Sequence, residues 1–209
     1  MMTRQEIQSF CDSQLETWQE CASRYDSLAQ ARTKTVTVHG REHTLMFNPA
    51  RMRSAAAKVA DGKVDRPCFL CRDKRPPQPT DITLTPTGSN NTYLLSVNPF
   101  PILPTHLTII SDRHCRQTIT AQRLEDMAYM ARHLEGFLVF FNGACSGASA
   151  PDHFHFQAVP NELVPLTAWD SQTQLHLGVQ NCEAGRVKVD HDKSDYCNIL
   201  CWNTADGLH

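Results

Sequence analysis

The sequence predicts an α+β fold, in which a mostly antiparallel sheet is flanked by helices. Apolar residues near the N-terminus recur at helical spacing, whereas the middle of the chain carries short alternating or apolar runs of strand composition. Many connections between these runs are too short for the crossover that parallel strands require. We therefore expect a single domain over residues 1–209.

The first predicted element is an N-terminal helix over residues 3–28. Thr3 and Glu6 match a capping box, and apolar residues from Ile7 to Tyr25 follow at roughly helical spacing. A hairpin is then expected over residues 33–47, where apolar residues alternate on both sides of a His-Gly turn.

Helices and strands are expected to alternate along the remainder of the chain. Asn48-Pro49 has the pattern of an N-cap followed by a first-turn proline, so a helix is expected near 50–59. Thr120 is a plausible N-cap for a second helix at 122–134. The segments expected to form strands are 81–85, 92–97, 106–111, 137–141, 153–157, 186–189 and 196–202.

Composition excludes several classes of protein. A 41% apolar fraction supports a real core, and a net charge of −2 gives no argument for nucleic acid or an anionic membrane as partner. No apolar run approaches the roughly 18 residues of a membrane span, and the N-terminus lacks a signal-peptide pattern. Nine cysteines without an export signal indicate a reducing, cytoplasmic location with free or metal-bound thiols.

An alternating segment, HFHFQ at 153–157, is the strongest functional signal. In a strand, His153, His155 and Gln157 share one face, and the two phenylalanines between them share the other. The loop at 143–150 is rich in small residues, which let backbone N–H groups approach an anion. The alternative is a half-buried strand with two surface histidines.

A second signal is the pair Cys68-x-x-Cys71, which has the spacing of zinc ligands. Two further ligands are needed, and His114 and His153 are candidates for a closed, structural Cys2His2 site. Two core cysteines and a redox pair remain as alternatives. Competing ligands are Cys115 and Cys145.

Taken together, these motifs resemble the histidine-triad (HIT-like) superfamily, in its galactose-1-phosphate uridylyltransferase and diadenosine-tetraphosphate phosphorylase branch. The segments RPCFLC, NPFPI and PDHFHFQ are most similar to those of an uncharacterised bacterial family of this branch. The resemblance covers residues 66–160, and related proteins continue with a second, similar half, which implies truncation at the C-terminus or absence of that half. The matching pieces, in order, are Cys68-x-x-Cys71, Asn98-Pro99-Phe100, Ser111-Asp112-Arg113-His114, Asn142, Ser146-Gly147-Ala148-Ser149 and His153-x-His155-x-Gln157.

The resemblance implies a role for each matching residue. His155 would attack an α-phosphorus and form a nucleotidyl-histidine, and Gln157 would hydrogen-bond the transferred phosphoryl group. Zinc, the implied cofactor, would be held by Cys68, Cys71, His114 and His153. The implied substrate-binding residues are Asn98 and Phe100 near the base and ribose, Asn142 near His155 or the phosphate, and Ser146, Gly147, Ala148 and Ser149 around phosphate oxygens.

The third position of the histidine motif favours a transferase over a hydrolase. Gln157 cannot exchange a proton near neutral pH, so a second phosphate-bearing substrate would accept the nucleotide. The expected donor is a nucleoside diphosphate sugar or a dinucleoside polyphosphate, and the expected acceptor is phosphate or a sugar phosphate. A nucleotide hydrolase and a non-catalytic nucleotide-binding zinc module remain as alternative functions. A homodimer is a possible oligomeric state, since an exposed sheet edge invites pairing between chains.

Overall fold

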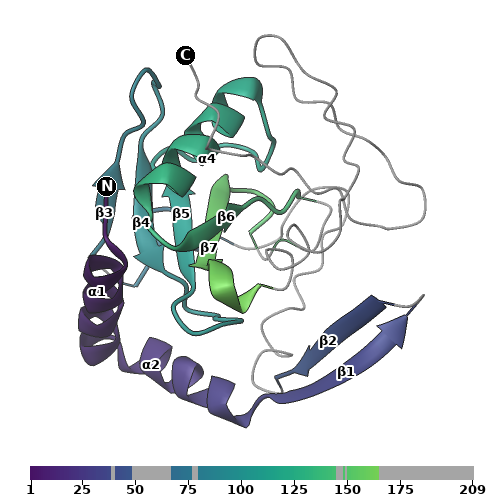
Figure 1. The fold of residues 1–209 in the computed structure, drawn as a ribbon. Helices are drawn as coiled ribbons and strands as arrows, with labels where there is room; N and C mark the ends of the chain where they lie inside the picture. The colour runs from purple at the N-terminus through teal and green to yellow at the C-terminus, as the bar shows by residue number, and fades with distance from the viewer. Residues whose placement is uncertain (39–40, 49–66, 77–79, 145–147, 149, 165–209) are drawn as a thin grey trace. The chain divides into compact units, whose positions relative to one another are not determined.

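The structure is a computed structural model of the 209-residue chain (Figure 1). It describes residues 1–38, 41–48, 67–76, 80–144, 148 and 150–164. The chain divides into two compact units, Met1–Leu163 and Val164–His209, and only Val164 of the second unit is described. The single domain expected over 1–209 therefore stays a prediction, as do the helix expected at 50–59 and the strands expected at 186–189 and 196–202, which lie outside the described residues.

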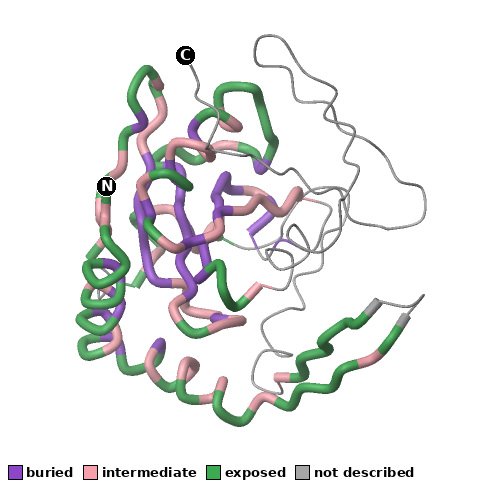
Figure 2. Tube along the Cα trace, in the orientation of Figure 1, coloured by how far each residue is buried: buried purple, intermediate pink, exposed green. Residues whose placement is uncertain are grey.

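A five-stranded antiparallel sheet occupies the centre of the first unit, in the order β3-β4-β5-β7-β6. The α+β class with a mostly antiparallel sheet is thus confirmed. All five residues of β4 and all five of β5 are buried, so the sheet is covered on both faces (Figure 2). The strands are β3 (Ile82–Leu84), β4 (Tyr93–Val97), β5 (Leu107–Ser111), β6 (Phe137–Phe140) and β7 (His155–Pro160).

The strand with the histidine motif lies inside this sheet, between β5 and β6. On one side Ile110 pairs with His155 and Thr108 with Gln157, and on the other side Phe140 pairs with Gln157. The strand expected at 153–157 begins two residues late, because His153 and the residue after it precede β7. The sheet therefore fixes the main chain of His155 and Gln157, whereas His153 lies in the turn that leads into it.

Helices cover one face of the sheet. They are α1 (Arg4–Thr17), α2 (Gln19–Asp26) and α4 (Ala121–His133). A 3-10 turn, η1 (Ser27–Gln30), follows α2 and has no buried residue. The capping box of Thr3 and Glu6 is confirmed, and so is the Thr120 cap of α4. A short 3-10 turn, η2 (Asn161–Leu163), follows β7.

The continuous helix expected over 3–28 is wrong, because the chain breaks at Trp18. Trp18 has φ −111° and ψ 77°, outside the helical region, and its side chain is buried. Apolar residues from both helices, Ile7 and Cys21 among them, reach the same core cluster. Burial of both apolar faces explains why the chain bends here without a glycine or proline.

The two faces of the sheet carry different side chains. Phe154 and Phe156 belong to the large core under the helices, as the alternating pattern predicted. The opposite face has a smaller apolar cluster of Leu70, Leu94, Ile110 and Ala150. Because Ile110 pairs with His155, the histidine faces the side on which the smaller cluster lies.

The predicted hairpin is confirmed as β1 (Arg32–Val38) and β2 (Arg41–Phe47), which pair along their whole length. Its turn, residues 39–40, is outside the described part. Leu45, Met46 and Phe47 are about half exposed on this hairpin. Of the described helices, none combines the length and apolar character needed to cross a bilayer.

Candidate active site and metal site

The four expected metal ligands lie together. Cys68 and Cys71 come from the turns before β3, His114 follows β5, and His153 precedes β7. Their ligand atoms all lie within 4.8 Å of one another. The sulfur of Cys68 is 3.3 Å from Nδ1 of His153, and the sulfur of Cys71 is 3.2 Å from Nδ1 of His114.

These distances fit a tetrahedral metal site. Zinc bound at its usual distances to a thiolate and an imidazole separates their ligand atoms by about 3.5 Å. The three sulfur–nitrogen distances run from 3.2 to 3.7 Å. His153 also donates from Nε2 to the carbonyl of Ser111 at 2.8 Å, which leaves Nδ1 facing the two sulfurs as ligand. The residues can therefore hold a metal ion in a closed Cys2His2 arrangement.

Cys68 and the competing ligand Cys115 lie in different environments. Burial raises the pKa of the Cys68 thiol to about 11, so a nearby cation is needed to hold it as a thiolate. Cys115 lies apart from the cluster, with its sulfur 3.5 Å from Oγ of Ser111 and 2.9 Å from Nη2 of Arg123. Cys145 lies outside the described residues.

His155 is buried, and its ring is fixed by its own strand. Nδ1 donates to the carbonyl of His153 at 2.9 Å, so the lone pair of the neutral ring is on Nε2. Burial lowers the pKa of His155 below its ordinary value, which favours the neutral form. The ring therefore has the tautomer that a nucleophile at Nε2 requires.

Gln157 is held by a histidine that the sequence analysis did not single out. Nδ1 of His106 accepts from the backbone N–H of Ile102 at 3.2 Å, so the neutral ring carries its hydrogen on Nε2. Nε2 of His106 then donates to Oε1 of Gln157 at 2.9 Å. This bond engages the amide oxygen of Gln157, so the NH2 group is the end of the amide that His106 does not engage. His106 is fully buried and directly precedes a strand, and a polar residue there was the only sequence signal for this role.

The Asn98-Pro99-Phe100 segment is joined to the same histidine. Oδ1 of Asn98 accepts from the N–H of Phe100 at 2.8 Å, and the backbone N–H of Asn98 donates to the carbonyl of His106 at 2.8 Å. Helix α2 supports this loop, because the guanidinium of Arg24 lies 4.2 Å from the centre of the Phe100 ring. The structure therefore brings Asn98 and Gln157, which are far apart in the sequence, to the same residue, His106.

The other expected substrate-binding residues are only partly described. Asn142 follows the end of β6, on the side of β7 opposite to β5. Ala148 is buried. Ser146, Gly147 and Ser149 lie outside the described residues, so the expected phosphate loop stays a prediction.

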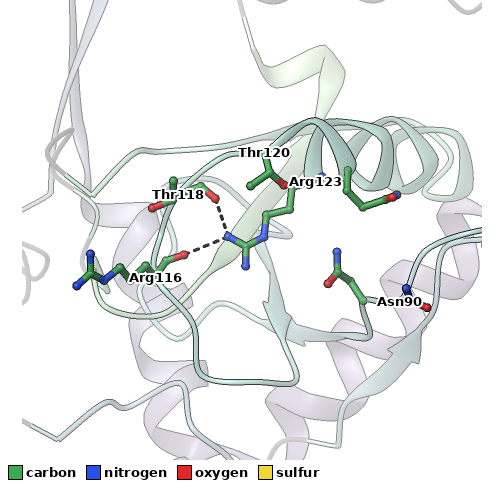
Figure 3. A pocket seen from close by; sticks show the side chains of 7 residues that line it. Asn90, Arg116, Thr118, Thr120 and Arg123 are labelled. Carbon is green, nitrogen blue, oxygen red and sulfur yellow. Dashed lines mark hydrogen bonds between the residues drawn. The ribbon is translucent and has the colours of Figure 1, made fainter.

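A pocket of about 540 Å³ lies at the start of α4 (Figure 3). None of the residues expected at the site lines it. The guanidinium of Arg123 is engaged there, since it donates to two carbonyls and lies 3.6 Å from the centre of the Phe154 ring. We assign no substrate to this pocket. Its lining residues are Asn90, Asn91, Arg116, Thr118, Thr120, Gln122 and Arg123.

Comparison with protein families places the chain in an uncharacterised group. Residues 10–160 match the family described as a domain of unknown function, DUF4922. The chain belongs to this family. The matched range includes the four cysteine and histidine ligands, His155 and Gln157. A search of curated proteins found no match.

Similar solved structures include crystal structures of the yeast Ap4A phosphorylase Apa2. The form in complex with Ap4A has 16% identity and a TM-score of 0.46, covering 85% of this chain and 62% of that one. The form in complex with AMP has 16% identity and a TM-score of 0.39, covering 78% and 55%. The third crystal structure of the same enzyme has 14% identity and a TM-score of 0.41, covering 72% and 52%.

The chain thus spans between 52% and 62% of the length of these yeast structures. With identities under 25% and TM-scores under 0.5, they do not transfer activity or substrate to this chain.

Proposed function

We propose that this protein is a zinc-containing nucleotidyltransferase or phosphorylase that works through a covalent nucleotide on His155. The observation that carries the proposal is the hydrogen bond from Nδ1 of His155 to the carbonyl of His153. It leaves Nε2 as the nucleophile, on a strand whose entry turn contributes His153 to the cluster of candidate metal ligands.

In the first step, Nε2 of His155 forms a bond to the α-phosphorus of the donor. The bond from that phosphorus to the bridging oxygen breaks, and its electron pair leaves on the phosphate of the departing group. A phosphate leaving group needs no proton near neutral pH, which suits a site whose third motif residue is an amide. The donor would be a nucleoside diphosphate sugar or a dinucleoside polyphosphate.

In the second step, an oxygen of the acceptor attacks the same phosphorus. The phosphorus–nitrogen bond breaks, and its electron pair returns to Nε2 of His155. The acceptor would be phosphate or a sugar phosphate. The NH2 group of Gln157, oriented through His106, would hydrogen-bond the phosphoryl oxygens as their charge changes.

The metal in this proposal has a structural role. Four protein ligands leave no open position for a substrate, and bound zinc would hold the turn that precedes the catalytic strand. His153 contributes Nδ1 to that site, and its carbonyl aims the ring of His155. Asn98 and Phe100 would lie near the nucleoside, with Asn142 and residues 146–149 near the phosphates.

Incubation with donor nucleotides radiolabelled at the α-phosphate tests the proposal. We expect an acid-labile, base-stable label on His155, which added phosphate or sugar phosphate discharges to a new nucleotide. Discharge by water alone would indicate a hydrolase, and tight binding without any adduct would indicate a binding module. Full activity of a His155→Ala variant would refute the mechanism, and zinc-free protein purified without chelator would refute the metal assignment.

A thermal-shift screen over nucleoside diphosphate sugars and dinucleoside polyphosphates would select the donors to label. Ligands that bind only the folded protein raise its melting temperature, and the rise grows with the logarithm of the ligand concentration relative to Kd.

A further inference from the structure

Gln117 is a buried polar residue that none of the roles above uses. It lies three positions after His114, and its exposed fraction is 3%. Burial of an amide is unfavourable unless its oxygen and nitrogen are hydrogen-bonded, so its partners indicate what it does.

The side chain of Gln117 bonds to the main chain of two site residues. Its Oε1 accepts from the N–H of His155 at 2.8 Å, and its Nε2 donates to the carbonyl of His155 at 3.0 Å. Nε2 also donates to the carbonyl of Asn142 at 2.9 Å. One amide thus makes both main-chain bonds that a paired strand would make to His155.

The position of these bonds explains why a side chain makes them. β6 pairs with β7 only as far as Phe140 and Gln157, so its ladder ends before His155 is reached. On the other side, β5 continues and pairs with His155 through Ile110. Gln117 therefore extends the pairing on the side of β6. A carboxamide suits this position because, like a peptide group, it has an acceptor and a donor in one plane.

The main chain of Gln117 is itself anchored to α4. Nη1 of Arg123 donates to the carbonyls of Arg116 and Thr118, the residues on either side of Gln117, at 3.1 and 2.6 Å (Figure 3). Nη2 of the same arginine lies 2.9 Å from the sulfur of Cys115. Arg123 therefore holds the main chain of residues 116–118, from which the amide of Gln117 extends.

We infer that Gln117 is a positioning residue for His155, an inference that rests on the proposed function. The ring of His155 is bonded to the carbonyl two residues earlier in its own chain, so the ring follows the main chain. By holding the N–H and carbonyl of His155, Gln117 sets the direction of Nε2. By holding the carbonyl of Asn142, it keeps the end of β6 beside the same histidine.

The test compares two buried glutamines. Gln117→Met keeps the size of the side chain and removes its three bonds. Gln14→Met is the matched control, because Gln14 is 5% exposed and its Oε1 accepts from the main-chain N–H of Thr80, a residue with no proposed role at the site. Both variants should lower the melting temperature, and both should retain zinc.

At equal folded fraction, only Gln117→Met should slow formation of the histidine adduct in single turnover, by about 10- to 100-fold, with the KM changed less than about 3-fold. Equal rates for the two variants would show a purely structural role and overturn the inference.

NMR chemical shifts of the His155 ring nitrogens report the tautomer of the ring and require no enzymatic activity. They therefore test the role of Gln117 even if the proposed function is wrong. That failure would appear as absence of adduct in the unsubstituted protein. We expect one tautomer in the unsubstituted and Gln14→Met proteins, and averaged shifts in Gln117→Met. Unchanged shifts in Gln117→Met would count against a positioning role, whatever the activity.

Discussion

The Cys2His2 cluster and strand β7 are neighbours that are held in place by different kinds of contact. Cys71, His114 and the other ligands lie in turns and loops, and their mutual contacts are between side chains. His155 and Gln157 lie in a central strand whose backbone is paired with its neighbours. With the proposed metal bound, the first region would be held by the ion, whereas the second is held by the sheet.

Because the two regions are held differently, the metal and the nucleophile should be removable one at a time. Loss of the metal should loosen the turn before β7 and leave the strand paired, because the ladder contains no metal ligand. Substitution of His155 should abolish the chemistry and leave both the metal and the ladder in place. The following experiments test whether the two regions fail independently.

The largest effect is expected for His155→Ala. Loss of the nucleophile should reduce nucleotide transfer by about 10⁴-fold or more, because the proposed covalent intermediate forms on His155. Zinc content should stay near that of the unsubstituted protein, since His155 is not in the ligand cluster. Steady-state kinetics and metal analysis measure the two properties. His43→Ala on the hairpin is the control, and zinc loss in His155→Ala would mean that the regions are not separate.

Gln157→Glu should have the next largest effect. Its carboxylate can still accept from Nε2 of His106, but it replaces the amide NH2 with an oxygen that faces the phosphoryl group. Loss of such a donor lowers kcat by about 10²- to 10³-fold. Quench-flow measurement of adduct formation and discharge locates the affected step. Unchanged rates would show that Gln157 does not contact the phosphoryl oxygens.

Cys71→Ser tests the metal region alone. Removal of one thiolate ligand should weaken zinc binding by at least about 10²-fold and lower the melting temperature, because metal binding stabilises the folded loops. Inductively coupled plasma analysis and calorimetry measure these changes. Cys115→Ser should retain zinc, because its sulfur lies outside the cluster. Zinc loss from Cys115→Ser, with zinc retained in Cys71→Ser, would reverse the ligand assignment.

The smallest effect is expected for His106→Phe. The ring volume is kept, but Gln157 loses the donor that orients its amide, and the N–H of Ile102 loses its acceptor. We expect kcat to fall about 10-fold, at the low end of the range for residues that orient site groups. The free energy of unfolding should fall by about 1 to 3 kcal/mol, as measured in urea. His133→Phe on α4 is the matched control, and equal kinetics for the two variants would remove His106 from the site.

Local patterns predicted most of the elements in this fold. The capping box of Thr3 and Glu6, the Thr120 cap and the hairpin all formed as expected, because caps and alternation depend on residues a few positions apart. The break at Trp18 could not be predicted in this way. It follows from burial of two helix faces in one core, and neither glycine nor proline marks it.

The alternation in the HFHFQ segment was enough to predict that its phenylalanines pack in the core, and the spacing of Cys68 and Cys71 was enough to predict candidate metal ligands. The sequence also named His114 and His153 as ligand candidates, but the folded chain was needed to place them beside those cysteines, away from Cys115, and to reveal that His106 orients Gln157. The tertiary structure also moved the start of the strand from His153 to His155. The physical reason is that strand order and register depend on contacts between residues far apart in the chain, which no local periodicity encodes.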